Sequence, residues 1–168
     1  MGRFVEVSDF TGDKTLSKAI SVNDKIQYYI DKYEPIYLTY LLGCDLYTEF
    51  INDLDVDNNP QEQRFMTIFE SFCIDDNCGI LRSEGFKEML LCFIYFEYVK
   101  DNSFQQTTNG VVQNDYEVSK NVPVSHSNAY DIYNQGINTY QTIQQYICDN
   151  SNDYEGFNGQ MKQKNSWL

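Results

Sequence analysis

Residues 86–100, FKEMLLCFIYFEYVK, predict the central helix of this protein. Their apolar side chains recur at the three- and four-residue spacing of an α-helix and form the longest apolar face in the sequence. That face consists of Phe86, Met89, Leu90, Phe93, Ile94 and Val99. Ser83 precedes the stretch as a candidate helix cap, while Glu97 and Lys100 place its far end in solvent. A helix with this face needs partners that bury it, so we expect a helical bundle.

The chain before the central helix is predicted to form short helices with bends between them. The sequence SVND at 21–24 resembles a capping box, and helical spacing then continues to about Tyr33. Pro35 disfavours helix at the residue before it and suits a first turn, so we expect the helix to restart there at a different angle. Gly43 allows a further bend, and helical spacing returns at 61–72.

The chain after the central helix is predicted to form a loop, two short extended pieces and a last helix. The polar run QQTTNG stops the central helix, and the extended pieces flank a candidate turn at Asn114–Asp115. Ser125 or Ser127 is expected to cap the last helix, whose apolar side continues to Ile147. The segment 73–85 carries turn signals and is interpreted as a connector.

Together these patterns predict a mainly all-α fold: a small helical bundle with one extended loop or β-hairpin-like arm and flexible termini. We expect an extended N-terminal arm at 1–20 and a flexible C-terminal tail at 149–168. The helical domain between them, 21–148, carries the loop or arm at 105–124, and a loop of this length is usually functional or disordered. With 168 residues, 42% of them hydrophobic, the chain can bury one core with appendages.

The charge of the chain narrows the class of protein. Asp and Glu number 25 against 12 Lys and Arg, a formal net charge of −13. That balance opposes any binding that depends on neutralising phosphates, so a nucleic-acid-binding protein is disfavoured. The N-terminus lacks the apolar core of a secretory signal, and no run approaches the roughly 18 apolar residues needed to span a bilayer. We therefore expect a soluble protein, made in the cytosol, with no membrane partner.

One acidic loop is a weak candidate for a calcium site. Asp53, Asp55 and Asp57 occupy the first, third and fifth positions of a calcium-binding loop. Asn58 then stands where a glycine makes the sharp turn, and Arg64 stands where a glutamate closes the site. A solvated acidic loop at a helix end is the better interpretation.

The cysteines indicate neither a disulfide framework nor a zinc site. There are five of them: Cys44, Cys73, Cys78, Cys92 and Cys148. An odd number spread through apolar stretches favours buried free thiols, so no structural disulfide is expected. Cys73 and Cys78 offer two thiolates, but zinc needs four ligands and the sequence has no second pair.

Catalytic patterns are equally weak. His126 lies between Ser125 and Ser127, but no nucleophile elbow, Cys-His signature or phosphate loop accompanies it. Two acidic pairs have i, i+4 spacing: Glu84 with Glu88, and Glu97 with Asp101. Such pairs are ordinary on a solvated helix face. We therefore expect no catalytic, cofactor-binding or metal-binding residues, and no enzyme.

Fourteen tyrosines are a more informative feature, and most of them fall in predicted helices. A half-buried tyrosine with a wet hydroxyl is common at protein interfaces, although the rim of a small core explains many such residues. We favour an interface role for a good part of them.

Two segments resemble a known family. They read YIDKYEPIYLTYLLGCDLYTEFINDL at 29–54 and FKEMLLCFIYFEYVKDNSFQQTTNGVVQ at 86–113. Both are similar to the head-tail connector, or neck-ring, proteins of tailed bacteriophages, and nearest to those of crAss-like and other Bacteroidetes phages. In that family a helix ending near KYEPxYL leads into LLGxDLYxEF, and a long aromatic helix leads into a TTxGVV loop and a C-terminal helix. The resemblance covers about Ile26 to Ile147.

The resemblance implies a structural virion protein that forms a ring of about twelve copies below the portal and joins capsid to tail. Its implied partners are the portal protein and other neck or tail proteins, and DNA would pass through the ring without specific binding. The segment 107–119 matches the arm that such proteins extend toward neighbours, and an arm of this kind binds by strand addition with small apolar anchors. The candidate interface residues are Thr107, Thr108, Asn109, Gly110, Val111, Val112, Tyr116 and Val118.

A second class of function is also compatible with the sequence. An acidic phage-encoded protein could inhibit a host factor, for example by mimicking DNA. Deletion of 107–119 separates the two hypotheses, because a connector would lose its place in the particle and a mimic would keep its target.

Overall fold

The computed structural model describes residues 2–16, 20–76, 79–102, 104–107, 110–113 and 124–164. This part of the chain contains five α-helices: α1 (Ile20–Leu42), α2 (Cys44–Asp53), α3 (Gln63–Phe69), α4 (Gly85–Asn102) and α5 (Val124–Asp149). Two antiparallel hairpins accompany them: β1 (Phe72–Asp76) with β2 (Gly79–Ser83), and β3 (Phe104–Thr107) with β4 (Gly110–Gln113). Two 3-10 turns, η1 (Val7–Asp9) and η2 (Gly12–Lys14), precede α1. The prediction of a mainly α-helical fold with a hairpin arm is confirmed.

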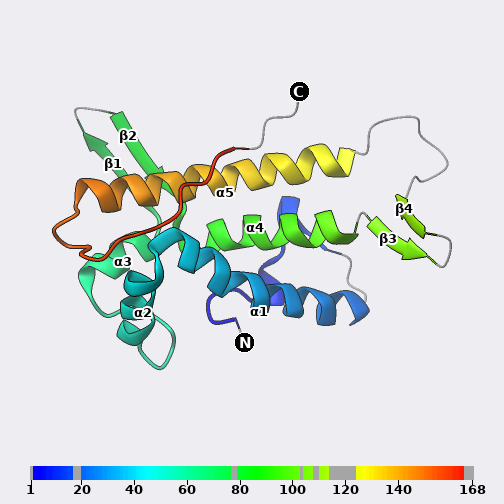
Figure 1. Ribbon diagram of the computed structural model, residues 1–168, viewed down its shortest axis with the longest axis horizontal. Coiled ribbons are helices and arrows are strands. Elements are labelled where there is room, and N and C mark those ends of the chain that lie inside the picture. The colour runs from blue at the N-terminus through cyan, green and yellow to red at the C-terminus, as the bar shows by residue number, and fades with distance from the viewer. Residues whose placement is uncertain are drawn as a thin grey trace.

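The three long helices determine the shape of the molecule. In Figure 1, α4 lies between α1 and α5 and runs in the direction opposite to both. The shorter helices α2 and α3 lie near the end of the bundle where α4 begins. The two hairpins lie at opposite ends of the long axis, β1–β2 near the start of α4 and β3–β4 beyond its end (Figure 1).

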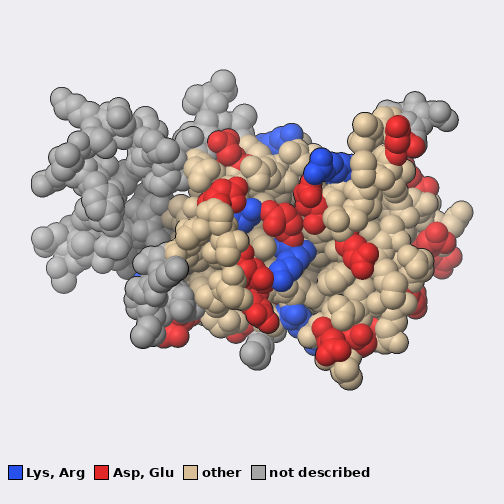
Figure 2. All heavy atoms as spheres, turned by 180° about the vertical axis from the view of Figure 1, so that it is seen from behind, with Lys and Arg blue, Asp and Glu red and all other residues tan. Residues whose placement is uncertain are grey.

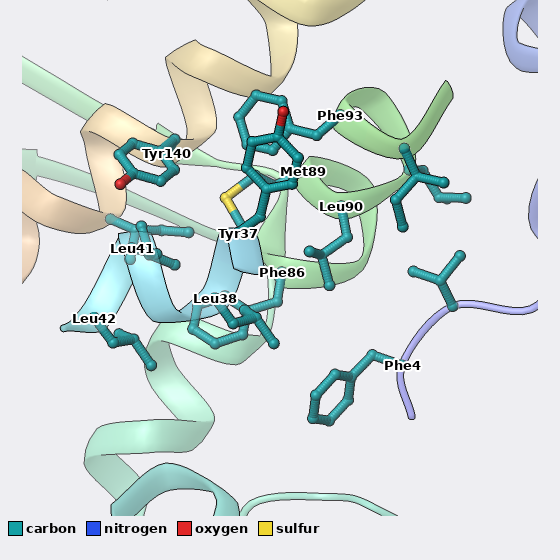
Figure 3. Close-up of a cluster of buried hydrophobic side chains, with 14 of the residues drawn as sticks. Phe4, Tyr37, Leu38, Leu41, Leu42, Phe86, Met89, Leu90, Phe93 and Tyr140 are labelled. Atoms are coloured by element: carbon teal, nitrogen blue, oxygen red, sulfur yellow. The ribbon is translucent and has the colours of Figure 1, made fainter. Parts of the chain in front are cut away.

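Helix α4 supplies the centre of the core, as its sequence predicts. Five residues of its predicted apolar face are fully buried: Phe86, Met89, Leu90, Phe93 and Ile94. Leu91, Cys92 and Phe96 are buried as well, because α4 has partners on more than one side. Figure 3 shows side chains of α1, α4 and α5 and of Phe4 gathered around this centre. Burial of each large apolar side chain contributes about 1.5–3 kcal/mol.

The predicted break at Pro35 is wrong, because α1 is one helix from Ile20 to Leu42 with Pro35 inside it. A proline has no backbone N–H, so Pro35 cannot donate the helical hydrogen bond to the carbonyl of Asp31, four residues earlier. Asp31 is on the exposed side of the helix, where water competes for such bonds. Tyr37 and Leu38, by contrast, are buried against the core. Tertiary packing of the flanking turns thus outweighs the cost of the proline.

The segment predicted as a connector, 73–85, contains most of the β1–β2 hairpin. The hairpin pairs Phe72 with Ser83 and Asp76 with Gly79. Phe72, expected to end a helix, is instead in β1, where its ring lies 5.2 Å from that of Tyr146 in α5. Packing against α5 therefore decides between strand and helix at this point.

Of the two predicted helix caps, the structure agrees with one and not with the other. The hydroxyl of Ser83 accepts a hydrogen bond from the backbone N–H of Gly85, the first residue of α4, at 3.1 Å. Ser83 therefore contributes to the start of α4 as predicted. Helix α5 begins at Val124, so neither Ser125 nor Ser127 precedes it as a cap.

The N-terminal segment is packed within the described residues 2–16, so the expectation of an extended arm at 1–20 is wrong for them. Phe4, Val5 and Phe10 are buried, and the side chain of Glu34 on α1 is held below them. Its carboxylate accepts hydrogen bonds from the backbone N–H groups of Arg3 at 2.6 Å, of Phe4 at 3.1 Å and of Val5 at 3.2 Å. Burial raises the pKa of Glu34, and the three N–H donors oppose that rise. One carboxylate thus fixes three consecutive residues to α1.

Replacement of Glu34 by Gln is expected to destabilise the protein by about 1–3 kcal/mol, because an amide nitrogen would face buried N–H donors. Urea denaturation followed by circular dichroism measures the loss. Asp24→Asn, at an exposed position on the same helix, is the matched control and should leave the midpoint unchanged. An equal loss in the two variants would contradict this role of Glu34.

The C-terminal segment is packed onto the helices as far as Lys162, so the expectation of a flexible tail does not hold for these residues. Its residues supply partners for the last carbonyls of α1, which a helix leaves without intrahelical partners. The backbone N–H of Gln160 donates to the carbonyl of Tyr40 at 2.6 Å, and that of Asn158 donates to the carbonyl of Leu42 at 3.4 Å. The tail is therefore the C-terminal cap of α1.

Helix α5 completes this cap. The amide of Gln144 donates to the carbonyl of Leu41 at 3.1 Å and to that of Gln160 at 3.1 Å. The hydroxyl of Tyr140 lies 2.7 Å from the carbonyl of Tyr40 and 2.5 Å from that of Gln160, and donates to one of them at a time. Further along, Tyr154 is buried and donates its hydroxyl to the carbonyl of Arg64 at 2.6 Å. The tail is thus joined to α1, α3 and α5.

Gly159→Ala is expected to destabilise the protein by about 1–3 kcal/mol, because a Cβ at this position would overlap the carbonyl of Leu41. Thermal unfolding of the variant beside Gln163→Ala, an exposed position in the same tail, measures the effect. A variant as stable as this control would show that the tail contributes little to the fold.

Candidate assembly interface

The β3–β4 hairpin is the predicted arm, and it lies beyond the end of α4 (Figure 1). Its strands pair Phe104 with Gln113 and Thr107 with Gly110. The pairing places the connection between the strands at 108–109. The predicted turn at Asn114–Asp115 therefore lies after this hairpin, outside the described residues.

The candidate interface residues divide between the strands and the rest of the segment. Thr107 belongs to β3, and Gly110, Val111 and Val112 belong to β4. The remaining four candidates lie outside the described residues: Thr108, Asn109, Tyr116 and Val118. The strand backbones thus bring half of the predicted set into one hairpin.

Local sequence explains why a hairpin forms here. Thr107, Val111 and Val112 are β-branched residues, which favour extended backbone. The sequence also contains the dipeptide Asn109–Gly110, a typical hairpin signal. Read together with the following valines, this dipeptide could have placed the turn beside β4, next to the connection at 108–109 that the strand pairing gives.

The arm has backbone groups available for a partner strand. The sheet that contains β3 and β4 has two strands, so each strand has one edge without a strand partner in the described part of the chain. Among the helices its main contact is with α4. A short hairpin of this kind is marginally stable by itself and gains stability when a further strand or helix packs against it.

Tyrosines cover the neighbouring end of the helical bundle. The ring of Tyr29 on α1 lies 5.5 Å from that of Tyr98 on α4, and its hydroxyl donates to Asp101 at 2.9 Å. Burial and this hydrogen bond raise the pKa of Tyr29, so its hydroxyl stays protonated. Tyr28 is 60% exposed, and the Nζ of Lys32 lies 4.7 Å from the ring centroid of Tyr33. An interface role for these residues stays a prediction.

Other tyrosines belong to the core. Tyr37, Tyr133, Tyr140 and Tyr154 are buried. The hydroxyl of Tyr37 donates to Glu97 at 2.8 Å, which keeps a polar group satisfied beside the apolar centre. These positions follow the alternative interpretation, in which tyrosines complete a small core.

A groove of about 480 Å³ lies beside β2, between α4 and α5. Its lining consists of Arg82, Glu84, Glu88, Cys92, Gln135, Asn138 and Thr139. The sequence patterns did not identify this groove, because its members come from three elements and share no motif.

The charges around the groove are largely paired. The Nζ of Lys14 is buried 2.6 Å from Glu88 and 3.3 Å from Asp13, and the Nε of Arg82 lies 2.9 Å from Glu84. Burial lowers the pKa of Lys14, but its carboxylate partners outweigh this effect and raise it overall. Figure 2 shows the same mixture across the face seen from behind, where Lys and Arg form a band among Asp and Glu.

The groove contains a cysteine that is poorly suited to nucleophilic chemistry. Burial raises the pKa of Cys92 to about 12, so the thiol stays protonated at neutral pH, and the thiolate is the reactive form. The expectation that the thiols are buried holds for Cys92, whereas Cys44, Cys73 and Cys148 are exposed free thiols. Cys78 lies outside the described residues.

The predicted weak metal and acid-base candidates have other partners. Asp53 accepts hydrogen bonds from the N–H groups of Gln61 and Glu62, and Asp55 accepts them from Asp57 and Asn59. These carboxylates therefore order the loop between α2 and α3. Among the described side chains, no group of three or more His, Cys, Asp or Glu could hold a metal ion.

The side chain of His126 lies outside the described residues, while its backbone is in the first turn of α5. Carboxylates of both acidic pairs have basic partners: Glu84 binds Arg82, Glu88 binds Lys14 and Glu97 binds Lys100.

Alkylation at neutral pH is expected to modify Cys44, Cys73 and Cys148 quickly and Cys92 only after unfolding, because Cys92 is buried and protonated. Peptide mass spectrometry after timed iodoacetamide treatment measures each rate, and urea-unfolded protein provides the reference. Equal rates at Cys92 and Cys44 in the folded protein would contradict this assignment.

A family model described as "Family of unknown function (DUF6712)" matches residues 38–166 of the chain. The matched span includes the end of α1, the β1–β2 hairpin, the groove beside β2, the β3–β4 arm and the tail. No curated protein and no solved structure matches the chain. In the part of the chain that the structure describes, no helix has both the length and the apolar character needed to cross a membrane.

Proposed function

The chain belongs to the DUF6712 family, a family of unknown function, and we propose that it is a structural protein of the head-tail connector of a tailed bacteriophage. In this proposal it forms a homo-oligomeric ring below the portal, joins the capsid to the tail and lines the channel for DNA. Ring formation from about twelve copies requires a heterologous contact that closes on itself. The protein acts by assembly in the virion and not by turnover.

The observation that carries the proposal is the β3–β4 arm beside a well-packed helical body (Figure 1). Both terminal segments are packed onto the helices, whereas the arm lies beyond the end of α4. A ring subunit needs such a segment, because strand addition supplies backbone hydrogen bonds to a neighbour without requiring a large apolar surface. The arm also contains the TTNGVV sequence on which the resemblance to connector proteins rests.

Electrostatics supports the same proposal. A net charge of −13 repels DNA, which suits a channel through which DNA must slide without being held. The cations that are present on the rear face stand among carboxylates, as Figure 2 shows. Lys14, which is buried, is also paired with a carboxylate, that of Glu88. Few strong phosphate contacts are therefore available on that face.

The same charge is the observation that favours the alternative, an acidic inhibitor that mimics DNA. A mimic needs a continuous array of negative charge that repeats the spacing of phosphates. The band of Lys and Arg on the rear face interrupts such an array there (Figure 2). The connector is therefore the better-supported proposal.

Purified particles of the source are expected to contain this chain in a copy number of one ring per portal. Replacement of 104–119 by a flexible Gly/Ser linker should leave the helical circular dichroism signal unchanged, because the described strands of the arm contact each other more than they contact the helices. It should abolish incorporation, because the proposal assigns the contacts with neighbours to the arm. Quantitative mass spectrometry of particles, relative to the portal protein, measures both quantities.

Val56→Ser is the control for this experiment, since Val56 is 97% exposed in the loop between α2 and α3. It should be incorporated like the unmodified chain. Absence of the unmodified chain from particles would contradict the connector, and retention of a host partner by the arm-deleted protein would favour the inhibitor.

A further inference from the structure

We infer that the groove beside β2 binds the β3–β4 arm of a second copy of this chain. The inference rests on the proposed ring and names the partner surface that the arm would contact. The groove is lined by β2, α4 and α5, and its volume of about 480 Å³ lies within the roughly 300–1,000 Å³ of pockets that hold ligands.

The distance between the arm and the groove makes this contact intermolecular. Cys92 is the groove residue on α4 that lies nearest to the arm, and α4 ends 10 residues later at Asn102, which at 1.5 Å per residue is about 15 Å along the helix. The arm continues away from that end, opposite to the β1–β2 hairpin (Figure 1). Its four-residue strands span about 13 Å, which is less than that distance, and they lie beyond the end of α4 (Figure 1). As placed, the arm does not reach the groove of its own chain, so the arm that we infer to bind there comes from another copy.

The arm and the groove are different surfaces of the chain, and this gives the contact the right symmetry. A surface that binds a different surface on a second copy makes a heterologous, head-to-tail interface. Repetition of such an interface produces a ring where the rotation closes. The proposed ring and this contact thus require the same geometry.

Strand β2 can supply backbone hydrogen bonds to the arm. It pairs with β1 along one edge, and its other edge has no strand partner in the described part of the chain. Arg82, the next-to-last residue of β2, lines the groove, so this strand borders the groove. Ile80 on the same strand is 68% exposed, an apolar side chain that an added strand would cover.

The chemistry of the lining fits an uncharged strand. The charged side chains around the groove are paired with each other, as Lys14 with Glu88 and Arg82 with Glu84. The amides of Gln135 and Asn138 provide both donors and acceptors. The strands of the arm, FQQT and GVVQ, contain no charged residue and three glutamines. A nucleic acid or an acidic peptide would meet the carboxylates of the lining instead.

The test uses the full-length protein and a fluorescent peptide with the sequence SFQQTTNGVVQN, residues 103–114. Fluorescence anisotropy should show saturable binding, and Gln135→Arg should weaken it about tenfold or more by filling the groove. Gln145→Arg, at an exposed position on the same helix α5, is the matched control and should leave the affinity within about twofold. A scrambled peptide of the same composition should not bind.

The absence of binding at about 1 mM peptide, or an equal effect of the two arginine variants, would overturn the inference. Its failure can be distinguished from that of the proposed function. A chain present in particles at the copy number of the ring, with no peptide binding, would leave the connector in place and refute the groove as its contact. Peptide binding by a chain absent from particles would support the groove contact and refute the connector.

Discussion

The ring of Phe93 joins the three long helices. Its centroid lies 4.4 Å from that of Tyr37 on α1, 5.3 Å from that of Tyr133 on α5 and 6.1 Å from that of Tyr140. Because α4 is surrounded in this way, the orientation of its two ends is determined by packing. Helix α4 begins directly after the β1–β2 hairpin and ends directly before the β3–β4 arm. The placement of α1 and α5 around α4 therefore depends on this aromatic contact.

Both terminal segments depend on α1 for their hydrogen bonds. The carboxylate of Glu34 holds the N-terminal segment, and the last carbonyls of α1 hold the tail. Each contact pairs backbone groups that would otherwise be buried without partners, so each is expected to be costly to break. The two ends of the chain thus consolidate the body of the molecule. The arm, which extends beyond that body, is the segment best placed to contact a neighbour.

Sequence reasoning succeeded where structure follows from local pattern. The apolar spacing of 86–100 located α4, and β-branched residues near a glycine located an arm of extended structure. It failed where a distant partner decides the outcome. Pro35 stays inside a helix because the residues after it are buried, and Phe72 joins a strand because α5 offers a ring for it to contact. The groove has residues from β2, α4 and α5, so no spacing within the sequence could reveal it.

The sequence by itself determined the mainly helical character of the chain, its acidic charge, its central helix and the presence of an arm. Each of these four features depends on composition or on a repeat within one segment, so none of them needs a tertiary partner to be recognised. Only the tertiary structure decided the path of the termini, the β1–β2 hairpin, the groove and its separation from the arm. These features depend on contacts between residues far apart in the chain, such as Tyr140 with Tyr40, whose free energy no local pattern encodes.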